Sequence, residues 1–206
     1  SVGFNGRLEL ARVELRGAAQ GIGGTGGGAT RTRIVESTIH SHTGIGIHAA
    51  DRFRITGSTV HSNGSYGLRT FGRRGVTVED CTFSGNGAAA IDVFGANTVV
   101  RNSTLVGDSA LEGGALRVVP GRQAILEASI LGDDAGAVPG LADVRNDGRV
   151  ISRGFNLVKD GFGGTPPMGR TSLDLVGVDP LLGALADKGG PTLTHPLSPG
   201  SPALEA

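Results

Sequence analysis

The chain repeats itself about every two dozen residues, and this repeat constrains the fold more than any other feature. Seven anchor positions, separated by 24, 21, 23, 22, 26 and 26 residues, are Val13, Ser37, Ser58, Cys81, Ser103, Ser129 and Phe155. An apolar residue stands two positions after each anchor, and another stands three positions before every anchor except the last. A fixed period of this size is the signature of a solenoid, in which each repeat packs only against its neighbours.

Within a repeat, the spacing of apolar residues predicts strands joined by tight corners. Phe53 and Ile55 lie two positions apart, which is β alternation. The step from Ile55 to Ser58 is three residues, so a corner interrupts the alternation there. The residues at this corner include types that tolerate turn backbone, namely Gly57, Asp80, Asn102 and Gly154. A further strand aligns on Ile47, Leu68, Ile91 and Leu116. Each repeat therefore predicts three short strands and three corners.

The composition agrees with a solenoid and not with a helical domain. The chain has 37 Gly among 206 residues, roughly 18% against a usual value of about 7%. Glycine at that frequency destabilises helices, whereas a coiled strand needs several turns in every repeat. The chain lacks Trp and has few aromatic residues, which suits a thin core of small branched side chains. We therefore predict an all-β parallel solenoid of about seven rungs over residues 1–164.

Two columns of polar residues are expected to stack along the solenoid, the first pointing inward and the second at the turn that leaves the second strand. The serines of the anchor column would bond to backbone groups at the neighbouring corner, and Cys81 would be an inert core residue beside them. The second column lies five residues further on, at His42, Asn63, Asn86, Asp108 and Asp134. Stacked polar side chains of this kind can form a hydrogen-bonded ladder along the axis.

Charge and hydropathy exclude several classes of partner. The chain has 19 basic and 19 acidic residues and no net charge, which argues against nucleic acid and against anionic membrane surfaces. No stretch approaches about 20 apolar residues, so no membrane span is predicted. A single Cys rules out an internal disulfide and is neutral on compartment. The chain begins at Ser1 without a signal peptide, and we interpret it as a fragment of a longer protein.

Two segments depart from the repeat. The segment Gly21–Gly28 is glycine-rich, but it lacks the Lys-Ser/Thr of a phosphate-binding loop and no helical pattern follows it. We interpret it as a glycine-lined edge. From Thr165 the chain holds seven of its nine Pro residues and loses the repeat. Residues 165–206 are therefore predicted to form an irregular cap of the same domain, because the open end of a solenoid exposes strand edges.

The end of the chain carries a series of short motifs that resemble a known family. They are Phe155-Asn156-Leu157-Val158, Asp174-Leu175, Val178-Asp179-Pro180-Leu181-Leu182-Gly183, Leu185-Ala186-Asp187, Gly189-Gly190-Pro191-Thr192, Thr194-His195 and Pro199-Gly200-Ser201-Pro202-Ala203. This series is similar to the end of the right-handed parallel β-helix domain in bacterial secreted proteins of the choice-of-anchor type. The resemblance is close over residues 150–205 and extends to the upstream rungs in pattern only.

The resemblance implies a single-stranded, right-handed, pectate-lyase-like β-helix and a place outside the cell or on its surface. It implies no particular reaction. The chain stops just past Ala203, where a family member would continue to its anchor, so the mode of attachment is left open.

One group of outward-facing residues is a candidate carbohydrate-contact face. The residues that follow the aligned third-strand positions are His48, Arg69, Asp92 and Arg117. Lyases of this fold need clustered carboxylates for Ca²⁺ and an Arg or Lys base on one sheet. The same residues would also form a plain charge ladder, with Asp92 neutralising the arginines on either side, and we favour that interpretation. Tyr66 and Phe71 are the only aromatic candidates near this face, with Phe71 expected to point inward.

Other chemistry-bearing residues do not converge on a site. His40 and His61 should stack, but the next rungs offer Ser84 and Val106 in place of a third metal ligand. The carboxylates Asp51, Asp80 and Asp92 belong to different corners or faces, whereas glycoside hydrolysis needs a close pair. The adjacent pair Asp133-Asp134 is interpreted as a solvated loop, and Asp179 and Asp187 as turn formers. We therefore predict no catalytic residues, no metal and no cofactor.

The preferred hypothesis is a non-catalytic extracellular or cell-surface module. It would act as a rigid, adhesin-like element or assemble with itself through its ends or faces. The alternative is a protein that binds or degrades polysaccharide, as a lyase, hydrolase or epimerase would, on the face formed by His48, Arg69, Asp92 and Arg117. The expected partners are thus extracellular polysaccharide or further copies of the chain, and not nucleic acid or a membrane.

Overall fold

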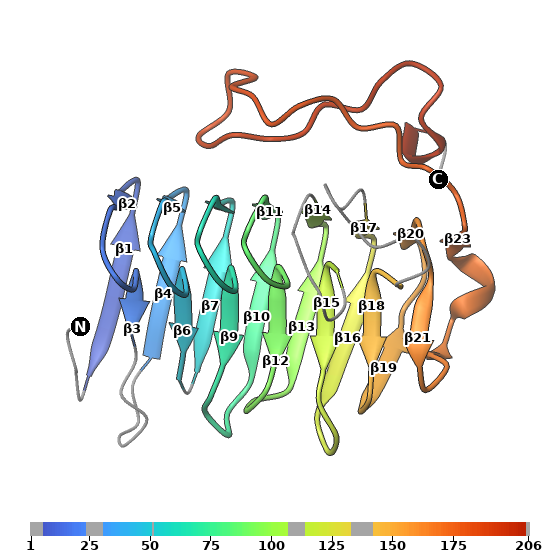
Figure 1. Ribbon diagram of the computed structural model, residues 1–206, viewed down its shortest axis with the longest axis horizontal. Coiled ribbons are helices and arrows are strands. Elements are labelled where there is room, and N and C mark those ends of the chain that lie inside the picture. The colour runs from blue at the N-terminus through green and yellow to red at the C-terminus, as the bar shows by residue number, and fades with distance from the viewer. Residues whose placement is uncertain (1–5, 24–30, 51, 107–113, 133–141, 205–206) are drawn as a thin grey trace.

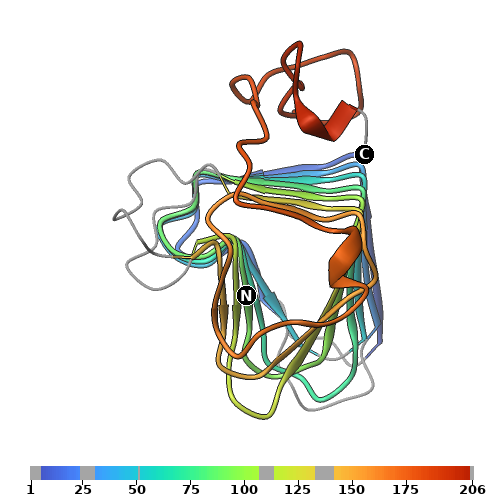
Figure 2. The ribbon, with the colours of Figure 1, turned by 90° about the vertical axis from the view of Figure 1, so that its right-hand side faces the viewer.

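Each repeat folds into one coil of short strands, and the coils stack along a common axis (Figure 1). The computed structural model describes residues 6–23, 31–50, 52–106, 114–132 and 142–204. Equivalent strands of successive coils pair in parallel, so the coils build three sheets that enclose the core (Figure 2). The predicted all-β parallel β-helix of about seven rungs is confirmed.

The first sheet, sheet A, has eight strands in the described residues. They are β1 (Arg7–Ala11), β4 (Arg31–Val35), β7 (Phe53–Thr56), β10 (Val76–Glu79), β13 (Thr98–Arg101), β16 (Gln123–Glu127), β19 (Arg149–Ser152) and β22 (Met168–Gly169). Sheet B also has eight. They are β2 (Glu14–Arg16), β5 (Thr38–His40), β8 (Thr59–His61), β11 (Thr82–Ser84), β14 (Thr104–Val106), β17 (Ile130–Gly132), β20 (Leu157–Val158) and β23 (Leu175–Val176).

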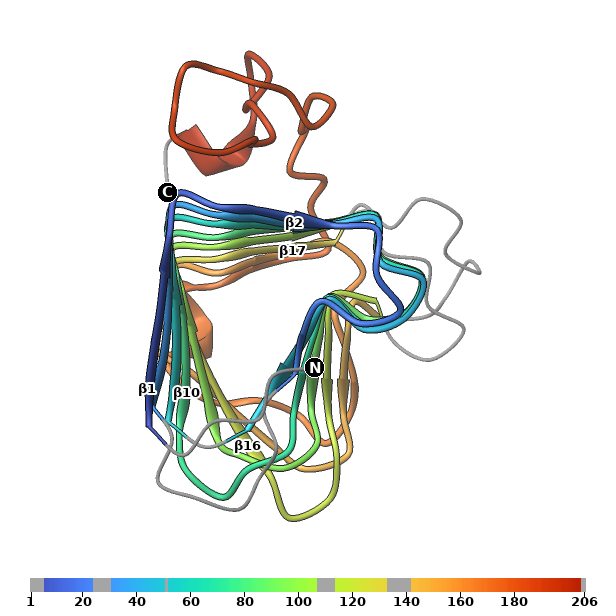
Figure 3. The same ribbon diagram turned by 90° about the vertical axis from the view of Figure 1, so that its left-hand side faces the viewer.

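Sheet C has seven strands in the same part of the chain. They are β3 (Ile22–Gly23), β6 (Ile47–Ala49), β9 (Leu68–Thr70), β12 (Ile91–Val93), β15 (Leu116–Val118), β18 (Val144–Asn146) and β21 (Phe162–Gly164). Two short 3₁₀ helices follow, η1 (Thr171–Leu173) and η2 (Pro202–Leu204). Viewed along the axis, sheets A, B and C form three sides of one section (Figure 3).

The core consists of apolar columns that run along the axis. Ile34, Ile55, Val78 and Val100 are successive partners in sheet A, and all are fully buried. Burying a side chain of this size contributes about 1.5–3 kcal/mol. A single coil cannot bury these side chains alone, so the stack as a whole supplies the stability.

The anchor column lies inside the coils and stabilises the corners. The Ser58 hydroxyl accepts a hydrogen bond from the Ser37 backbone N–H at 3.1 Å and donates to the Thr56 carbonyl at 2.9 Å. Ser103 and Ser129 repeat this arrangement in later coils. The residue before each anchor has a positive φ, for example 57° at Gly57 and 54° at Asp80, which explains the corner residues. The predicted role of the serine column is confirmed.

The second polar column is confirmed where the structure describes it. The Asn63 side-chain carbonyl accepts a hydrogen bond from the His42 N–H at 3.2 Å, and its Nδ2 donates to Asn86 Oδ1 at 2.9 Å. His42 Nδ1 in turn accepts a hydrogen bond from Ala18 N–H at 3.1 Å. The two remaining members of the predicted column, Asp108 and Asp134, lie outside the described residues.

The last repeat is one residue out of the predicted register. We aligned Phe155 with the anchor column, but Ser129 N–H donates to Asn156 Oδ1 at 3.2 Å, so Asn156 is the true anchor. Phe155 takes the corner, with φ of 62° and 56% of its surface exposed. The inward partner of Leu131 is accordingly Val158 and not Leu157. A phenyl ring is too large for a column built of serines, whereas the Asn amide continues its hydrogen bonds.

The tail differs from the predicted cap. Solenoid pairing continues through β22 and β23 to Val176, beyond the expected limit at residue 164. The chain then turns back and lies over the outer face of sheet B (Figures 1 and 2). Antiparallel bridges join Leu182 to Leu197 and Ala186 to Thr194.

Hydrogen bonds hold the tail on coils far from the end of the solenoid. Thr59 Oγ1 donates to the Leu193 carbonyl at 2.6 Å, and His195 Nε2 lies 2.9 Å from Ser84 Oγ. The outer face of sheet B presents small hydroxyl side chains here, and these give the tail carbonyls polar partners. This part of the tail therefore covers a face of sheet B and not the last rung.

Candidate functional site

The predicted contact residues do form one row on the outer face of sheet C. His48, Arg69, Asp92 and Arg117 are successive register partners on β6, β9, β12 and β15. The row continues to Arg145 on β18, which the sequence alignment missed. The interval from Leu116 to Val144 is 28 residues, longer than any repeat used for the alignment. The signal was the alternation Val144–Arg145–Asn146, which matches Leu116–Arg117–Val118.

Asp92 is on the outward side of the strand but is not accessible to solvent. Its exposed fraction is 0%, and its Oδ2 lies 2.9 Å from Arg69 Nε. The expectation that Asp92 faces a ligand is therefore wrong. The charge-ladder interpretation holds for this pair, because the carboxylate neutralises Arg69 within the row. Removing one member of such a buried pair typically costs about 3–5 kcal/mol, so Asp92 has a structural role.

Three aromatic rings surround the Arg69 guanidinium. Its central carbon lies 5.2 Å from the ring centre of Tyr66, 5.1 Å from that of Phe71 and 4.4 Å from that of Phe94. These distances are within the range of cation–π attraction. Phe71 is 38% exposed and Phe94 is 42% exposed, so the prediction that Phe71 points inward is wrong. The ion pair with Asp92 and the three rings together hold Arg69 in place.

Phe94 is a site residue that the sequence reasoning missed, although a signal was present. Phe71 stands three residues after Leu68, and Phe94 stands three residues after Ile91, so they are equivalent in successive repeats. Gly95 allows the close contact between these coils. A Cβ at Gly95 would lie only 2.3 Å from the Phe71 carbonyl carbon, so a larger residue would push the two turns apart. The two rings lie 5.5 Å apart at an angle of 49°.

His48 closes the aromatic group at its other side. Its ring meets Phe71 edge-on, with an interplanar angle of 85°. Burial, followed by the nearby charge of Arg69, lowers the pKa of His48, so the imidazole is neutral near pH 7. The row therefore carries three arginines against Asp92, and Arg145 also pairs with Asp147 at 2.8 Å. The face combines exposed aromatic surface with fixed guanidinium groups.

The exposed rings and the guanidinium groups of this arrangement are suited to binding. Exposed rings stack on the apolar faces of sugars, and guanidinium groups bind carboxylates in a planar fork. A general acid or base must reach the proton that it transfers. Asp92, the carboxylate within the row, is buried against Arg69 and cannot reach a ligand.

The histidine pair stacks as predicted, on the outer side of sheet B. The rings of His40 and His61 are 4.7 Å apart and nearly parallel, and His40 Nε2 lies 2.9 Å from Glu14 Oε1. Burial and the neighbouring His40 lower the pKa of His61. Within the described residues, no group of three His, Cys, Asp or Glu side chains could hold a metal ion.

The remaining predicted candidates are accounted for individually. Asp80 occupies a corner away from Asp92, while Asp51, Asp133 and Asp134 lie outside the described residues. Asp179 and Asp187 each accept a backbone hydrogen bond from the residue two positions on, at 2.8 Å, as turn formers do. Burial raises the pKa of Cys81 to about 12, which makes its thiol unreactive.

The predicted glycine-lined edge is described only in part. Of the glycine-rich segment, residues 21–23 are described, and Ile22–Gly23 form β3. A Cβ at Gly21 would lie 2.2 Å from the Gly46 carbonyl oxygen, so glycine there permits a close approach of the next coil.

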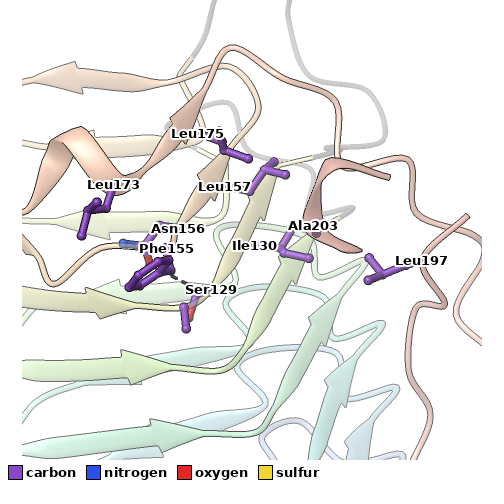
Figure 4. Close-up of a pocket in the computed structure, with 10 residues that line it drawn as sticks. Ser129, Ile130, Phe155, Asn156, Leu157, Leu173, Leu175, Leu197 and Ala203 are labelled. Atoms are coloured by element: carbon purple, nitrogen blue, oxygen red, sulfur yellow. Dashed lines mark hydrogen bonds between the residues drawn. The ribbon is translucent and has the colours of Figure 1, made fainter. Parts of the chain in front are cut away.

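A separate apolar hollow of about 200 Å³ lies where the tail meets the last coils (Figure 4). Phe155, Leu173 and Leu175 contribute exposed apolar surface to it, and Leu197 and Ala203 come from the tail. Its polar lining includes Asn156, whose amide already bonds to Asp174 Oδ1 at 2.9 Å. The hollow therefore lacks the charged groups that mark the outer face of sheet C.

The comparisons with known proteins agree with the fold. The family described as "Right handed beta helix region" matches residues 3–127, which is more than half of the chain. No curated protein and no solved structure gives a significant match. The described part of the chain contains no helix long and apolar enough to cross a bilayer.

Proposed function

Because the chain belongs to the family of right-handed β-helix proteins, we propose that it is a non-catalytic, adhesin-like module that binds acidic polysaccharide on the outer face of sheet C. One observation carries this proposal. Arg69 is fixed among three aromatic rings, two of them exposed, in a row that continues to Arg117 and Arg145. Aromatic surface would stack on sugar rings while the arginines pair with their carboxylates.

The spacing of the row supports an extended ligand. Neighbouring strands lie about 4.8 Å apart, which is comparable to the length of one sugar unit. A polysaccharide chain lying along the solenoid axis would therefore meet one coil with about each sugar. Since stacked coils are rigid, the site is preorganised and little conformational entropy is lost on binding.

The burial of the Asp92 carboxylate favours binding of a polysaccharide over its cleavage. The enzymatic alternative included Asp92 as the carboxylate of its face, and that carboxylate is fully buried beside Arg69. The same burial makes Asp92 a fixed counter-charge that holds Arg69 toward the rings.

We further propose that the module works outside the cell or on its surface, in a bacterial protein of the choice-of-anchor type. The support is the motif series at the end of the chain, from Phe155 to Ala203. Fractionation of cells that express the parent protein tests this placement. Recovery in the cytoplasmic fraction alone would contradict it.

Titration calorimetry with oligogalacturonate, alginate oligomers and neutral dextran tests the binding proposal. The double variant Phe71→Ala/Phe94→Ala should weaken binding of the acidic oligomers at least tenfold, or about 1.4 kcal/mol. The control is Phe155→Ala, which removes a more exposed ring from a distant corner and should leave affinity unchanged. Equal loss in both variants, or preference for dextran, contradicts the proposed site. Release of new reducing ends or unsaturated products by the wild type contradicts the non-catalytic part.

Self-association is a second candidate, which the C-terminal end of the solenoid favours. Apolar side chains are exposed there from the end of η1 to just after β23, namely Leu173, Leu175, Val176 and Val178. Such a patch is typical of an interface between proteins. Sedimentation velocity over a wide range of concentrations tests it, with a concentration-dependent dimer expected and a monomer throughout counting against it.

A further inference from the structure

The outer face of sheet A carries a second charged feature, unrelated to the row on sheet C. A shallow groove of about 260 Å³ lies across β4, β7 and the start of β10. Four arginines from two successive coils line it, namely Arg31, Arg33, Arg52 and Arg54. Sheet A lies on a different side of the solenoid from the tail, which covers sheet B (Figure 3).

The strand register arranges these arginines as a two-by-two grid. Arg33 and Arg54 are direct partners in β4 and β7. Arg31 and Arg52 immediately precede the partners Thr32 and Phe53, so they occupy equivalent positions one step away. Coils are about 4.8 Å apart, and two residues along a strand span about 6.7 Å. The four arginines therefore lie close together around the groove, with Arg33 drawn toward Glu9 on one side and Arg54 toward Glu79 on the other.

The acidic residues at the edges of the grid are already shared between arginines. Glu9 pairs with Arg33 at 3.4 Å and also with Arg7 at 2.9 Å. At the other edge, Glu79 pairs with Arg54 and, at 2.8 Å, with Arg101. Each carboxylate is thus divided between two guanidinium groups.

Arg31, the first residue of β4, and Arg52, directly before β7, contribute the unbalanced charge of the grid. Between residues that the structure describes, no ion pair involves Arg31 or Arg52, and both are exposed. Like charges at this distance repel one another, so the arrangement costs free energy unless an anion occupies it. The whole chain has no net charge, which makes this local excess a specific feature and not a general basic character.

The groove also offers a neutral donor and an open approach. Thr77 is the register partner of Arg54 on β10, which places a hydroxyl next to the guanidinium row. Gly75 lines the same end without a side chain. The site has no exposed aromatic ring comparable to Phe71 or Phe94, because Phe53 is buried in the core. Its lining therefore supplies charged groups and a hydroxyl but no exposed ring that could stack on a sugar.

We propose that this groove binds a tetrahedral oxyanion, as in a sulfate ester or a phosphate group of a polymer. Tetrahedral oxyanions have several oxygens that can accept hydrogen bonds from different guanidinium forks at once. A single carboxylate has only two oxygens and satisfies fewer of the four arginines. The groove is thus a second binding site with a different ligand class from the face on sheet C.

The test is titration calorimetry at physiological salt with three probes. These are inorganic pyrophosphate, a sulfated tetrasaccharide and a phosphodiester-linked glycerol oligomer. The double variant Arg31→Gln/Arg52→Gln should weaken binding of the best probe at least tenfold. Arg52→Lys keeps the charge but loses the planar fork, and it should weaken binding several-fold. The better ligand among the two polymers identifies the natural source of the oxyanion.

The matched control removes the same charge at the other end of sheet A, from Arg149 on β19 and from Arg153 directly after that strand. Arg149→Gln/Arg153→Gln should leave affinity unchanged, and thermal unfolding should confirm that every variant is folded. An equal loss in the control shows non-specific attraction and overturns the proposal, as does the absence of binding by all three probes. Equal affinity of this groove for oligogalacturonate would also overturn it. The variant Phe71→Ala/Phe94→Ala leaves the groove on sheet A intact. A failure of the groove proposal can therefore be distinguished from a failure of the proposed site on sheet C.

Discussion

The polar ladder inside the coils should be essential for stability, and Asn63 is its most informative member. Its side chain is 2% exposed and connects three coils, accepting from His42 N–H and donating to Asn86 Oδ1. The substitution Asn63→Ala leaves the buried His42 N–H without a partner. An unsatisfied buried donor costs about 1–3 kcal/mol, and the lost bond to Asn86 adds about 1 kcal/mol. The Asn63 backbone N–H still satisfies Asn86 Oδ1, at 3.2 Å. We therefore expect a loss of about 2–4 kcal/mol.

Urea unfolding followed by far-ultraviolet circular dichroism measures this loss. Thr43→Ala is the matched control, because Thr43 lies on the equivalent turn of the preceding coil, beside His42, but is exposed. It should change stability by less than about 0.5 kcal/mol. If Asn63→Ala and Thr43→Ala unfold at the same urea concentration with the same slope, the ladder does not stabilise the fold and the argument fails. A changed slope for Asn63→Ala would indicate separate unfolding of part of the solenoid.

Three further predictions concern the fold. A Cβ at Gly67 would lie 2.8 Å from the Ala90 carbonyl oxygen and from Phe83 Cδ1. Gly67→Ala should therefore lower the free energy of unfolding by about 1–3 kcal/mol in the same urea assay. An unchanged free energy of unfolding would contradict the close stacking of the coils. Leu105 is fully buried in the core, and Leu105→Ala should cost about 2–5 kcal/mol; a loss below about 1 kcal/mol would mean that the coils repack freely. Burial raises the pKa of Asp143 from its usual 3.8 to about 6, so the folded state binds the proton more tightly than the unfolded state. The stability from this group is therefore fully present below pH 3.8 and is lost as the pH rises through 6, by up to about 3 kcal/mol. Asp143→Asn should flatten the change in urea midpoint between pH 4 and pH 7.5, and an unaltered pH profile would assign that change to other groups.

Most of the fold could be predicted because solenoid stacking maps sequence period directly onto space. The columns through Ile55, Ser58 and Leu68 needed only the repeat and the strand alternation. The strand register confirms the first and third, and the serine hydrogen bonds confirm the second. The prediction failed where side-chain size and not spacing decided the register, at Phe155 and Asn156. It also failed for the tail, because segments without a repeat carry no periodic signal of where they dock.

The candidate row could be predicted in its membership but not in its accessibility. Alternation places Asp92 and Arg69 on the same outward side, as observed. Alternation does not show that the longer Arg69 and the neighbouring rings leave the shorter Asp92 carboxylate without contact with water. Phe94 was missed because it lies in a turn, where the strand period does not apply.

Parallel stacking places like residues above like, so a charged column in a solenoid creates repulsion at every coil. A residue of opposite charge within the column relieves this repulsion, as Asp92 does between Arg69 and Arg117. In the grid on sheet A, Glu9 is the register partner of Arg33 and Glu79 pairs with Arg54. Between residues that the structure describes, no ion pair involves Arg31 or Arg52. A repulsive cluster on a rigid surface has a definite cost, while surface arginines contribute little to folding. The difference between the neutralised pair on sheet C and the partly neutralised grid on sheet A therefore supports the proposal that an external anion pairs with Arg31 and Arg52.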